Sequence, residues 1–195
     1  MKFKLLVITL VMITLLCSCK KAVKELNQEI PSEIVTAKEI TKITDKIIKD
    51  EWGDKEFYLS EVTMYLDENH RGSLSLIYAD GLEIKTTVPN MLKVQVNTNK
   101  HKVVRQKRLT RDSKLYPGVI AFDDWMIDSI DAYNLTLELF KEVDTFDRAI
   151  ISSTPSFEGD SEDWSVILWK DKTRYSCFIN SYTGKVISYN TEVVE

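Results

Sequence analysis

Cysteine is scarce in this chain of 195 residues: there are three, and two of them, Cys17 and Cys19, lie near the amino terminus. If those two are removed or modified there, Cys177 remains alone and an intramolecular disulfide is excluded. The fold must then be held together by its apolar core. Cys177 lies in the strand-like stretch "RYSCFIN". There we expect a buried, unreactive thiol, because the sequence shows no nearby base to activate it.

Histidine is scarcer still, with two residues, His70 and His101, each in a predicted turn. Neither belongs to a C-x-x-C or H-E-x-x-H pattern, so a zinc site is not predicted. A phosphate-binding G-x-x-x-x-G-K loop is also missing, since "YTGK" lacks the first glycine and is typical of a hairpin turn. We therefore predict no cofactor, no metal and no catalytic residue.

An acidic run near residue 160 is the nearest approach to a metal-binding pattern. Its carboxylates lack the alternating spacing of an EF-hand loop, which favours a solvated hairpin loop over a calcium site. The run consists of Glu158, Asp160, Glu162 and Asp163.

The chain begins with a pattern typical of secretion. Lys2 and Lys4 precede an uncharged, mostly apolar run from Leu5 to Leu16. This run has the length of a signal-peptide core and falls well short of the roughly 20 residues that a membrane-spanning helix needs.

The next four residues, Leu16-Cys17-Ser18-Cys19, resemble the lipobox of bacterial lipoproteins. Cys19 fits the lipidated position, because Ser18 then supplies the small residue before the cut. The resemblance implies a signal peptide over 1–18, a diacylglycerol on Cys19, and durable anchoring outside the cytoplasm. Lys20, in place of Asp, points to the outer membrane if the host is Gram-negative. An ordinary cleaved signal or an uncleaved anchor helix is the alternative.

The charge of the chain is mildly acidic. The formal net charge of −4 becomes −4 − 2 = −6 once Lys2 and Lys4 leave with the signal. This argues against a nucleic-acid partner.

Hydrophobic periodicity predicts an α+β fold in which helices pack on antiparallel β-sheet. A helix over 36–53 begins with a capping box formed by Thr36 and Glu39, and a second helix over 125–143 has Asp128 as a candidate N-cap. Ile130, Tyr133, Leu137 and Phe140 would form the buried stripe of the second helix. Strands are predicted over 56–66, 73–79, 91–98, 102–107, 148–154, 164–170, 174–180 and 185–190.

These elements suggest two tandem helix-plus-sheet units. Residues 19–35 are expected to form a lipidated tether that holds the folded part off the membrane. The first unit covers 36–107, a linker 108–124 and the second unit 125–195. The hairpins "VNTNKHKVV" (96–104) and "INSYTGKVI" (179–187) match each other best.

The stretch "DWSVILWKDKTRYSCFINSYTGKVISYN" resembles the carboxy-terminal part of PepSY-like domains. The matching residues are Trp164, Val166, Tyr175, Asn180, Thr183, Gly184, Lys185 and Val186. The resemblance implies a tandem PepSY-like or cystatin-like repeat whose first copy has His101 where the turn glycine belongs. It implies that Gly184 adopts a positive φ and that Trp164 packs between helix and sheet. Such modules are generally non-catalytic and regulatory, some of them acting beside peptidases.

A basic run is the sharpest charge feature. It comprises Lys100, Lys102, Arg105, Lys107, Arg108, Arg111 and Lys114, opposed only by Asp112. These cations are candidates for contact with anionic headgroups or an acidic partner. A solvated strand edge, on which Lys and Arg prevent further pairing, is the favoured interpretation.

Trp164 and Trp169 are predicted to lie on opposite faces of one strand, so one can enter the core while the other stays available to a partner.

The leading hypothesis for function is a non-enzymatic, membrane-anchored extracytoplasmic lipoprotein that binds a protein partner in the envelope. A small envelope enzyme with a helix–sheet pocket is the second hypothesis. A structural protein that binds lipid headgroups or wall polymer is the third.

Overall fold

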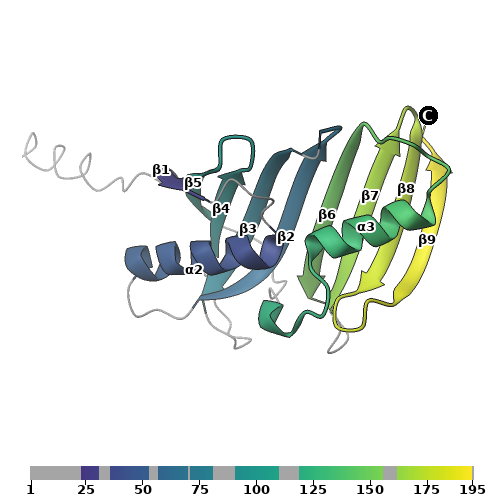
Figure 1. Cartoon of the computed structure of the whole chain (residues 1–195). Helices are drawn as coiled ribbons and strands as arrows, with labels where there is room; N and C mark the ends of the chain where they lie inside the picture. Colours follow the sequence, from purple (N-terminus) through teal and green to yellow (C-terminus); the bar gives the residue numbers. More distant parts are fainter. Residues whose placement is uncertain are drawn as a thin grey trace, which may run out of the picture.

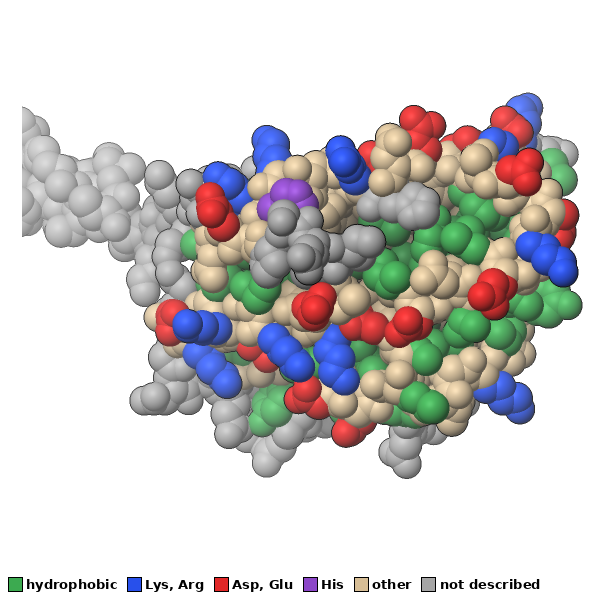
Figure 2. All heavy atoms as spheres, in the orientation of Figure 1, with side chains coloured by type: hydrophobic (Ala, Val, Ile, Leu, Met, Phe, Trp, Pro, Cys, Tyr) green, Lys and Arg blue, Asp and Glu red, His purple; other side chains and the backbone are tan. Residues whose placement is uncertain are grey.

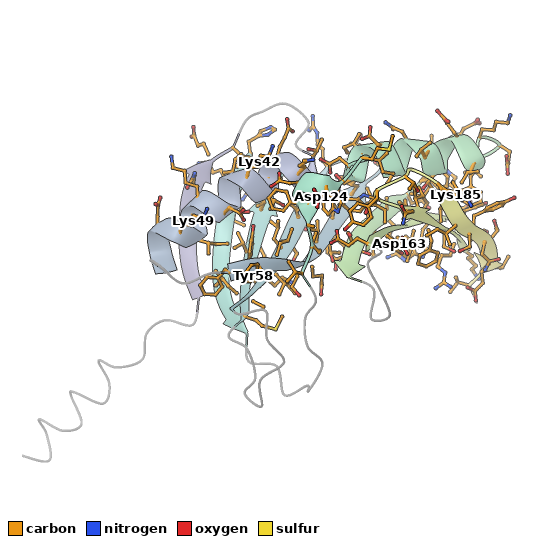
Figure 3. All side chains as sticks on the ribbon, turned by 90° about the horizontal axis from the view of Figure 1, so that it is seen from below. Lys42, Lys49, Tyr58, Asp124, Asp163 and Lys185 are labelled. Atoms are coloured by element: carbon orange, nitrogen blue, oxygen red, sulfur yellow. The ribbon has the colours of Figure 1, made fainter. Side chains whose placement is uncertain are left out.

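The structure is a computed structural model that describes residues 23–30, 36–52, 57–69, 71–80, 91–109, 119–155 and 162–194. The predicted signal peptide, Cys19, His70 and Arg111 lie outside these residues. The described part of the chain is an α+β fold dominated by one sheet of nine antiparallel strands in the order β1-β5-β4-β3-β2-β6-β7-β8-β9. Two helices cover one face of this sheet and lie roughly end to end across it (Figure 1). A view turned by 90° separates the helical layer from the strands (Figure 3).

The order of elements repeats along the chain. A helix is followed by four strands, and then a second helix is followed by four more. The first series is α2 (Ala37–Trp52), β2 (Phe57–Asp67), β3 (Gly72–Asp80), β4 (Met91–Asn97) and β5 (Lys102–Leu109). The second is α3 (Ser129–Leu139), β6 (Arg148–Pro155), β7 (Glu162–Lys170), β8 (Thr173–Asn180) and β9 (Val186–Val193). A short 3₁₀ helix, η1 (Phe122–Asp124), precedes α3.

The two series form one sheet because β2 pairs with β6. Their antiparallel register runs from Val62 opposite Ser153 to Asp67 opposite Arg148. The sequence predicted the strands on both sides of this junction but not the junction itself.

The core lies between the helices and the sheet. Trp164, Val166 and Leu168 point into it from β7 and are fully buried. Trp164 donates from Nε1 to the carbonyl of Ile127 at 3.2 Å. Its ring meets that of Trp125 edge to face, with centroids 4.6 Å apart. The predicted position of Trp164 between helix and sheet is therefore confirmed.

Helix α2 begins with the predicted capping box. The Glu39 amide donates to Thr36 Oγ1 at 3.3 Å, and the Thr36 amide donates to Glu39 Oε2 at 3.2 Å. Ile40, Ile47 and Ile48 are buried as the 3.6-residue period requires.

Helix α3 is shorter than predicted and buries a different stripe. Asp128 is its N-cap, as expected, in a capping box with Asp131. Tyr133 and Phe140 are buried, but Ile130 and Leu137 are only half-buried. Small residues take the central positions instead, and they let the helix lie close to the sheet. These residues are Ser129, Ala132 and Thr136.

The amino-terminal ends of the two helices are joined by hydrogen bonds. The Ala37 amide donates to Ser129 Oγ at 3.0 Å. The Lys38 amide donates to the Asp128 carboxylate, at 3.1 Å to Oδ2, and the Ser129 amide donates to Oδ1 of the same carboxylate. One aspartate thus accepts from the first turns of both helices, whose amides are otherwise unsatisfied.

Part of the predicted tether forms a strand of the sheet. Strand β1 (Val23–Glu29) pairs antiparallel with β5 at one edge of the sheet. The register sets Glu25 opposite Arg105 and Glu29 opposite Lys102. Glu29 and Lys102 carry opposite charges, which favours pairing across a ladder. Ile30, buried at the end of β1, donates its amide to the His101 carbonyl at 2.8 Å.

The two hairpins that matched in sequence also match in their hydrogen bonds. Asn97 Oδ1 accepts from the Lys100 amide at 2.9 Å, and Asn180 Oδ1 accepts from the Thr183 amide at 3.0 Å. Gly184 has the predicted positive φ of 68°, and His101 adopts a φ of 48° at the equivalent place. A histidine there carries a steric cost that glycine avoids.

Candidate functional site

The predicted basic run does not form a free sheet edge. Lys102, Arg105, Lys107 and Arg108 lie in β5, which pairs with β4 on one side and with β1 on the other. Lys100 is exposed in the turn before β5, and Arg111 lies outside the described residues. The interpretation of the basic run as a solvated sheet edge is therefore wrong, because β1 occupies that edge.

On the helical side, cations and carboxylates intermingle over α2, while hydrophobic side chains are more frequent over α3 and the strands beside it (Figure 2).

One buried polar cluster resembles the start of a catalytic site. Thr44 Oγ1 and Tyr78 Oη are 2.7 Å apart, linking α2 to β3. Burial raises the pKa of Asp45, while its hydrogen bond with Tyr78 acts in the opposite direction. Burial, followed by the charge of Asp45, raises the pKa of Tyr78 well above its ordinary value. The contact between Thr44 and Tyr78 joins helix α2 to strand β3 inside the core.

A second carboxylate is buried by contacts that occupy both of its oxygens. Glu162 was predicted in a solvated acidic loop, but it is the first residue of β7 and only 4% exposed. Its Oε1 accepts from the Ala121 amide and its Oε2 from Trp125 Nε1, both at 2.7 Å. These bonds fasten the segment before α3 to the sheet, which explains why the carboxylate is buried. Asp163 is also in β7, with its Oδ1 accepting from Asn180 Nδ2 at 3.3 Å.

The other candidates for a reactive or metal-binding site are the Cys177 thiol and the acidic residues near position 160. Cys177 is free and buried, and burial raises the pKa of its thiol, which keeps the unreactive protonated form. Within the described ranges, no three His, Cys, Asp or Glu side chains are grouped so that they could hold a metal ion. Glu158 and Asp160 of the acidic run lie outside those ranges.

The sheet face that neither described helix covers carries exposed aromatic residues, which the sequence analysis did not bring together. Alternation along the strands turns Tyr65, Ile150, Ile167 and Phe178 away from the helices. Tyr65 lies opposite Ile150, which lies opposite Ile167. Tyr65 is 47% exposed and Phe178 42% exposed, whereas Ile150 and Ile167 are half-buried. We call these four residues the open-face patch.

Charged residues border the open-face patch on one side. The row Asp67, Arg148, Trp169, Arg174 and Glu192 crosses five neighbouring strands. The Arg148 guanidinium lies over the Trp169 ring, 4.5 Å from its centroid, and Arg174 forms an ion pair with Glu192. Trp169 thus lies on the face opposite Trp164, as predicted. An apolar centre with a charged border is typical of a protein-binding surface.

Comparisons with known proteins support the fold alone. No family model matches the sequence, and no curated protein matches it. A crystal structure of a Clostridium difficile 630 protein, provisionally described as a lipoprotein, matches with a TM-score of 0.54 and 16% sequence identity. The match covers 85% of this chain and 100% of that one. Among the residues that the structure describes, no helix is long and apolar enough to cross a bilayer.

Proposed function

We propose that this chain is an extracytoplasmic lipoprotein, anchored through Cys19, that acts without catalysis as a binding and regulatory module for a protein partner in the cell envelope. The open-face patch supplies the contact. Two exposed aromatic side chains on a sheet face without helices are the observation that carries this proposal. Large aromatic residues dominate the energetics of protein interfaces.

Two observations support the anchor, and a third shows where the anchor would hold the fold. The lipobox-like sequence stands directly behind a signal-like segment. The C. difficile protein of similar fold is itself provisionally described as a lipoprotein. Lastly, Val23 begins the first strand only a few residues after Cys19, so a lipid there would hold the sheet near the membrane.

We expect the Cys19→Ala variant to lose its anchor and to move into the soluble envelope fraction or the medium. A diacylglycerol with a further acyl chain contributes about 0.8 kcal/mol per buried CH₂, so its loss should abolish stable membrane association. Fractionation and mass spectrometry of the mature amino terminus measure this. A Cys17→Ala variant is the matched control and should keep a lipidated Cys19. An unmodified Cys19 in the parent chain would refute the anchor.

We further propose that the chain is a tandem of two PepSY-like units. Thr98 and Ser181 occupy equivalent hairpin positions, and each donates both its amide and its hydroxyl to the carbonyl at the start of another strand, Gly72 and Glu162 respectively. Both helices begin with capping boxes. Thr44 and Thr136, eight residues after the N-caps, each donate to the carbonyl four residues earlier. Local bonds of this kind, repeated at matching places, support duplication and hence a regulatory module of the PepSY-like type.

Replacing both exposed aromatic residues of the patch should weaken partner capture. We expect the Tyr65→Ser, Phe178→Ser variant to retain an envelope protein at least about tenfold more weakly than the parent, since a lost aromatic anchor costs about 2 kcal/mol. The measurement is affinity capture from detergent-solubilised envelope with the full chain, followed by quantitative mass spectrometry.

Met126→Ser is the matched control, because Met126 is 73% exposed and lies between η1 and α3, away from the patch. It should retain the same protein as the parent. Equal capture by all three chains would exclude the open-face patch as the binding surface. Turnover of a small substrate by the purified chain would instead favour an enzyme.

A further inference from the structure

The last strand leaves an apolar edge uncovered. β9 is the outermost strand and pairs with β8 alone among the described strands. Every residue from Ile187 to Val194 is exposed. Four of the seven exposed large hydrophobic residues of the described chain lie in this short segment, which makes it the densest apolar stretch on the surface. They are Ile187, Tyr189, Val193 and Val194.

This edge lacks the devices that usually prevent strands from adding to a sheet. Natural edges carry lysine, proline, covering segments or inward charges. β9 contains no Lys, Arg or Pro, and its one charged residue, Glu192, is paired with Arg174. Its single irregularity is a bulge between Val186 and Ser188. At the opposite edge of the sheet, β5 is paired with β1, which is the outermost strand there.

The backbone of β9 presents a regular row of unpaired groups to the outside. The Val194 amide donates to the Lys172 carbonyl at 2.7 Å, so it points toward β8. Alternation in an antiparallel ladder then turns the amides and carbonyls of Tyr189, Thr191 and Val193 outward. The β8–β9 register is unbroken from Ser188 to Val193, so this row is continuous.

We propose that β9 pairs antiparallel with β9 of a second copy of this chain, about a twofold axis at Asn190. This register sets Tyr189 opposite Thr191 of the second copy, a pairing of aromatic and β-branched residues that favours a ladder. Glu192 falls opposite Ser188 of the second copy, so the strand's one carboxylate faces no like charge.

The charges at the ends of β9 favour the antiparallel arrangement. Lys185 precedes the strand and Glu192 lies near its end, and Lys185 is seen at this side of the sheet in Figure 3. Antiparallel pairing brings the basic start of one strand beside the acidic end of the other. Parallel pairing would set like charges side by side.

Charge substitution at the symmetry position tests the proposal. In the paired state Asn190 faces Asn190 of the second copy, so Asn190→Lys or Asn190→Glu alone would place like charges directly opposite each other. We expect the parent chain, purified in detergent, to show a monomer–dimer equilibrium in sedimentation. Each single variant should lower the dimer association constant at least about tenfold, a difference of about 1.4 kcal/mol. An equimolar mixture of the two variants should recover the dimer, because Lys then faces Glu.

The matched controls are Asn134→Lys and Asn134→Glu, at an exposed position of α3 far along the chain from β9. Both should dimerise like the parent. A parent chain that stays monomeric across the concentration series would overturn the proposal. So would dimers that survive in both Asn190 variants, or a mixture that remains monomeric. Partner capture through the open-face patch depends on other side chains, so its failure would leave this result unaffected.

Discussion

The Trp164→Ala variant should lose about 3–5 kcal/mol of unfolding free energy, the usual cost of truncating a large buried aromatic side chain. Trp164 has no solvent-exposed surface, and it joins β7 to the segment before α3 through its indole nitrogen and its contact with Trp125. Removal leaves a cavity between helix and sheet and an unpaired Ile127 carbonyl. Urea denaturation followed by circular dichroism measures the loss.

Trp169→Ala is the matched control on the same strand. Trp169 lies on the other face, half-buried beside the exposed Arg148, so its truncation should cost about 1 kcal/mol or less. If the two substitutions destabilised the protein equally, the assignment of faces to β7 would be incorrect.

Replacement of Asp128 by alanine should destabilise both helices at once. Its carboxylate accepts from the amide of Ser129 in α3 and from that of Lys38 in α2. Loss of an ordinary N-cap costs about 1 kcal/mol. Because two first turns depend on this side chain, we expect a loss of about 2–3 kcal/mol for Asp128→Ala, measured as a shift of the denaturation midpoint.

Two further variants separate the hydrogen bonds from other effects. Asp128→Asn keeps one acceptor oxygen in the place of Oδ1, which lies within hydrogen-bond distance of both the Ser129 amide and, at 3.3 Å, the Lys38 amide. Asn also caps helices about as well as Asp, so this variant should stay within about 1 kcal/mol of the parent. Thr36→Ala removes a cap from α2 alone and should cost about 1 kcal/mol. If Asp128→Ala proved no worse than Thr36→Ala, the bond between the helices would contribute nothing measurable.

The helices and eight of the strands could be predicted because their signals are local. The apolar positions of α2 recur at the helical period, and Thr36 and Glu39 at its start form a capping box. The turn from Asn180 to Lys185 contains the glycine that a positive φ requires. Each signal resides within a few neighbouring residues, so one sequence is enough to detect it.

The features that were missed depend on residues far apart in the chain. Nothing near Val23 indicates a strand, because β1 forms only when β5 offers an edge. Glu162 looked like part of an acidic loop, since its two partners, Ala121 and Trp125, lie about forty positions earlier and are joined to it only by the fold.

The open-face patch was also missed because its residues lie far apart in the sequence. Tyr65, Ile150, Ile167 and Phe178 come from four strands, and only the pairing of β2 with β6 brings the first of them beside the others. The basic run, in contrast, is continuous in sequence and was therefore noticed first. Pairing of β5 on both sides shows that a run of cations on a strand does not by itself mark an edge.

The strand formed from the expected tether fixes how far the molecule can extend from a bilayer. Nine strands spaced about 4.8 Å apart set β9 about 40 Å from β1. If a lipid at residue 19 anchors the chain, as proposed, a single copy can therefore stand upright, with β1 at the membrane and β9 at the far side of the sheet. Two chains joined at β9 would have their anchors at the two extremes, about 80 Å apart. Both could reach one flat membrane only if the shared sheet lay down along it, so pairing would change which surfaces face the bilayer and which face the cell envelope.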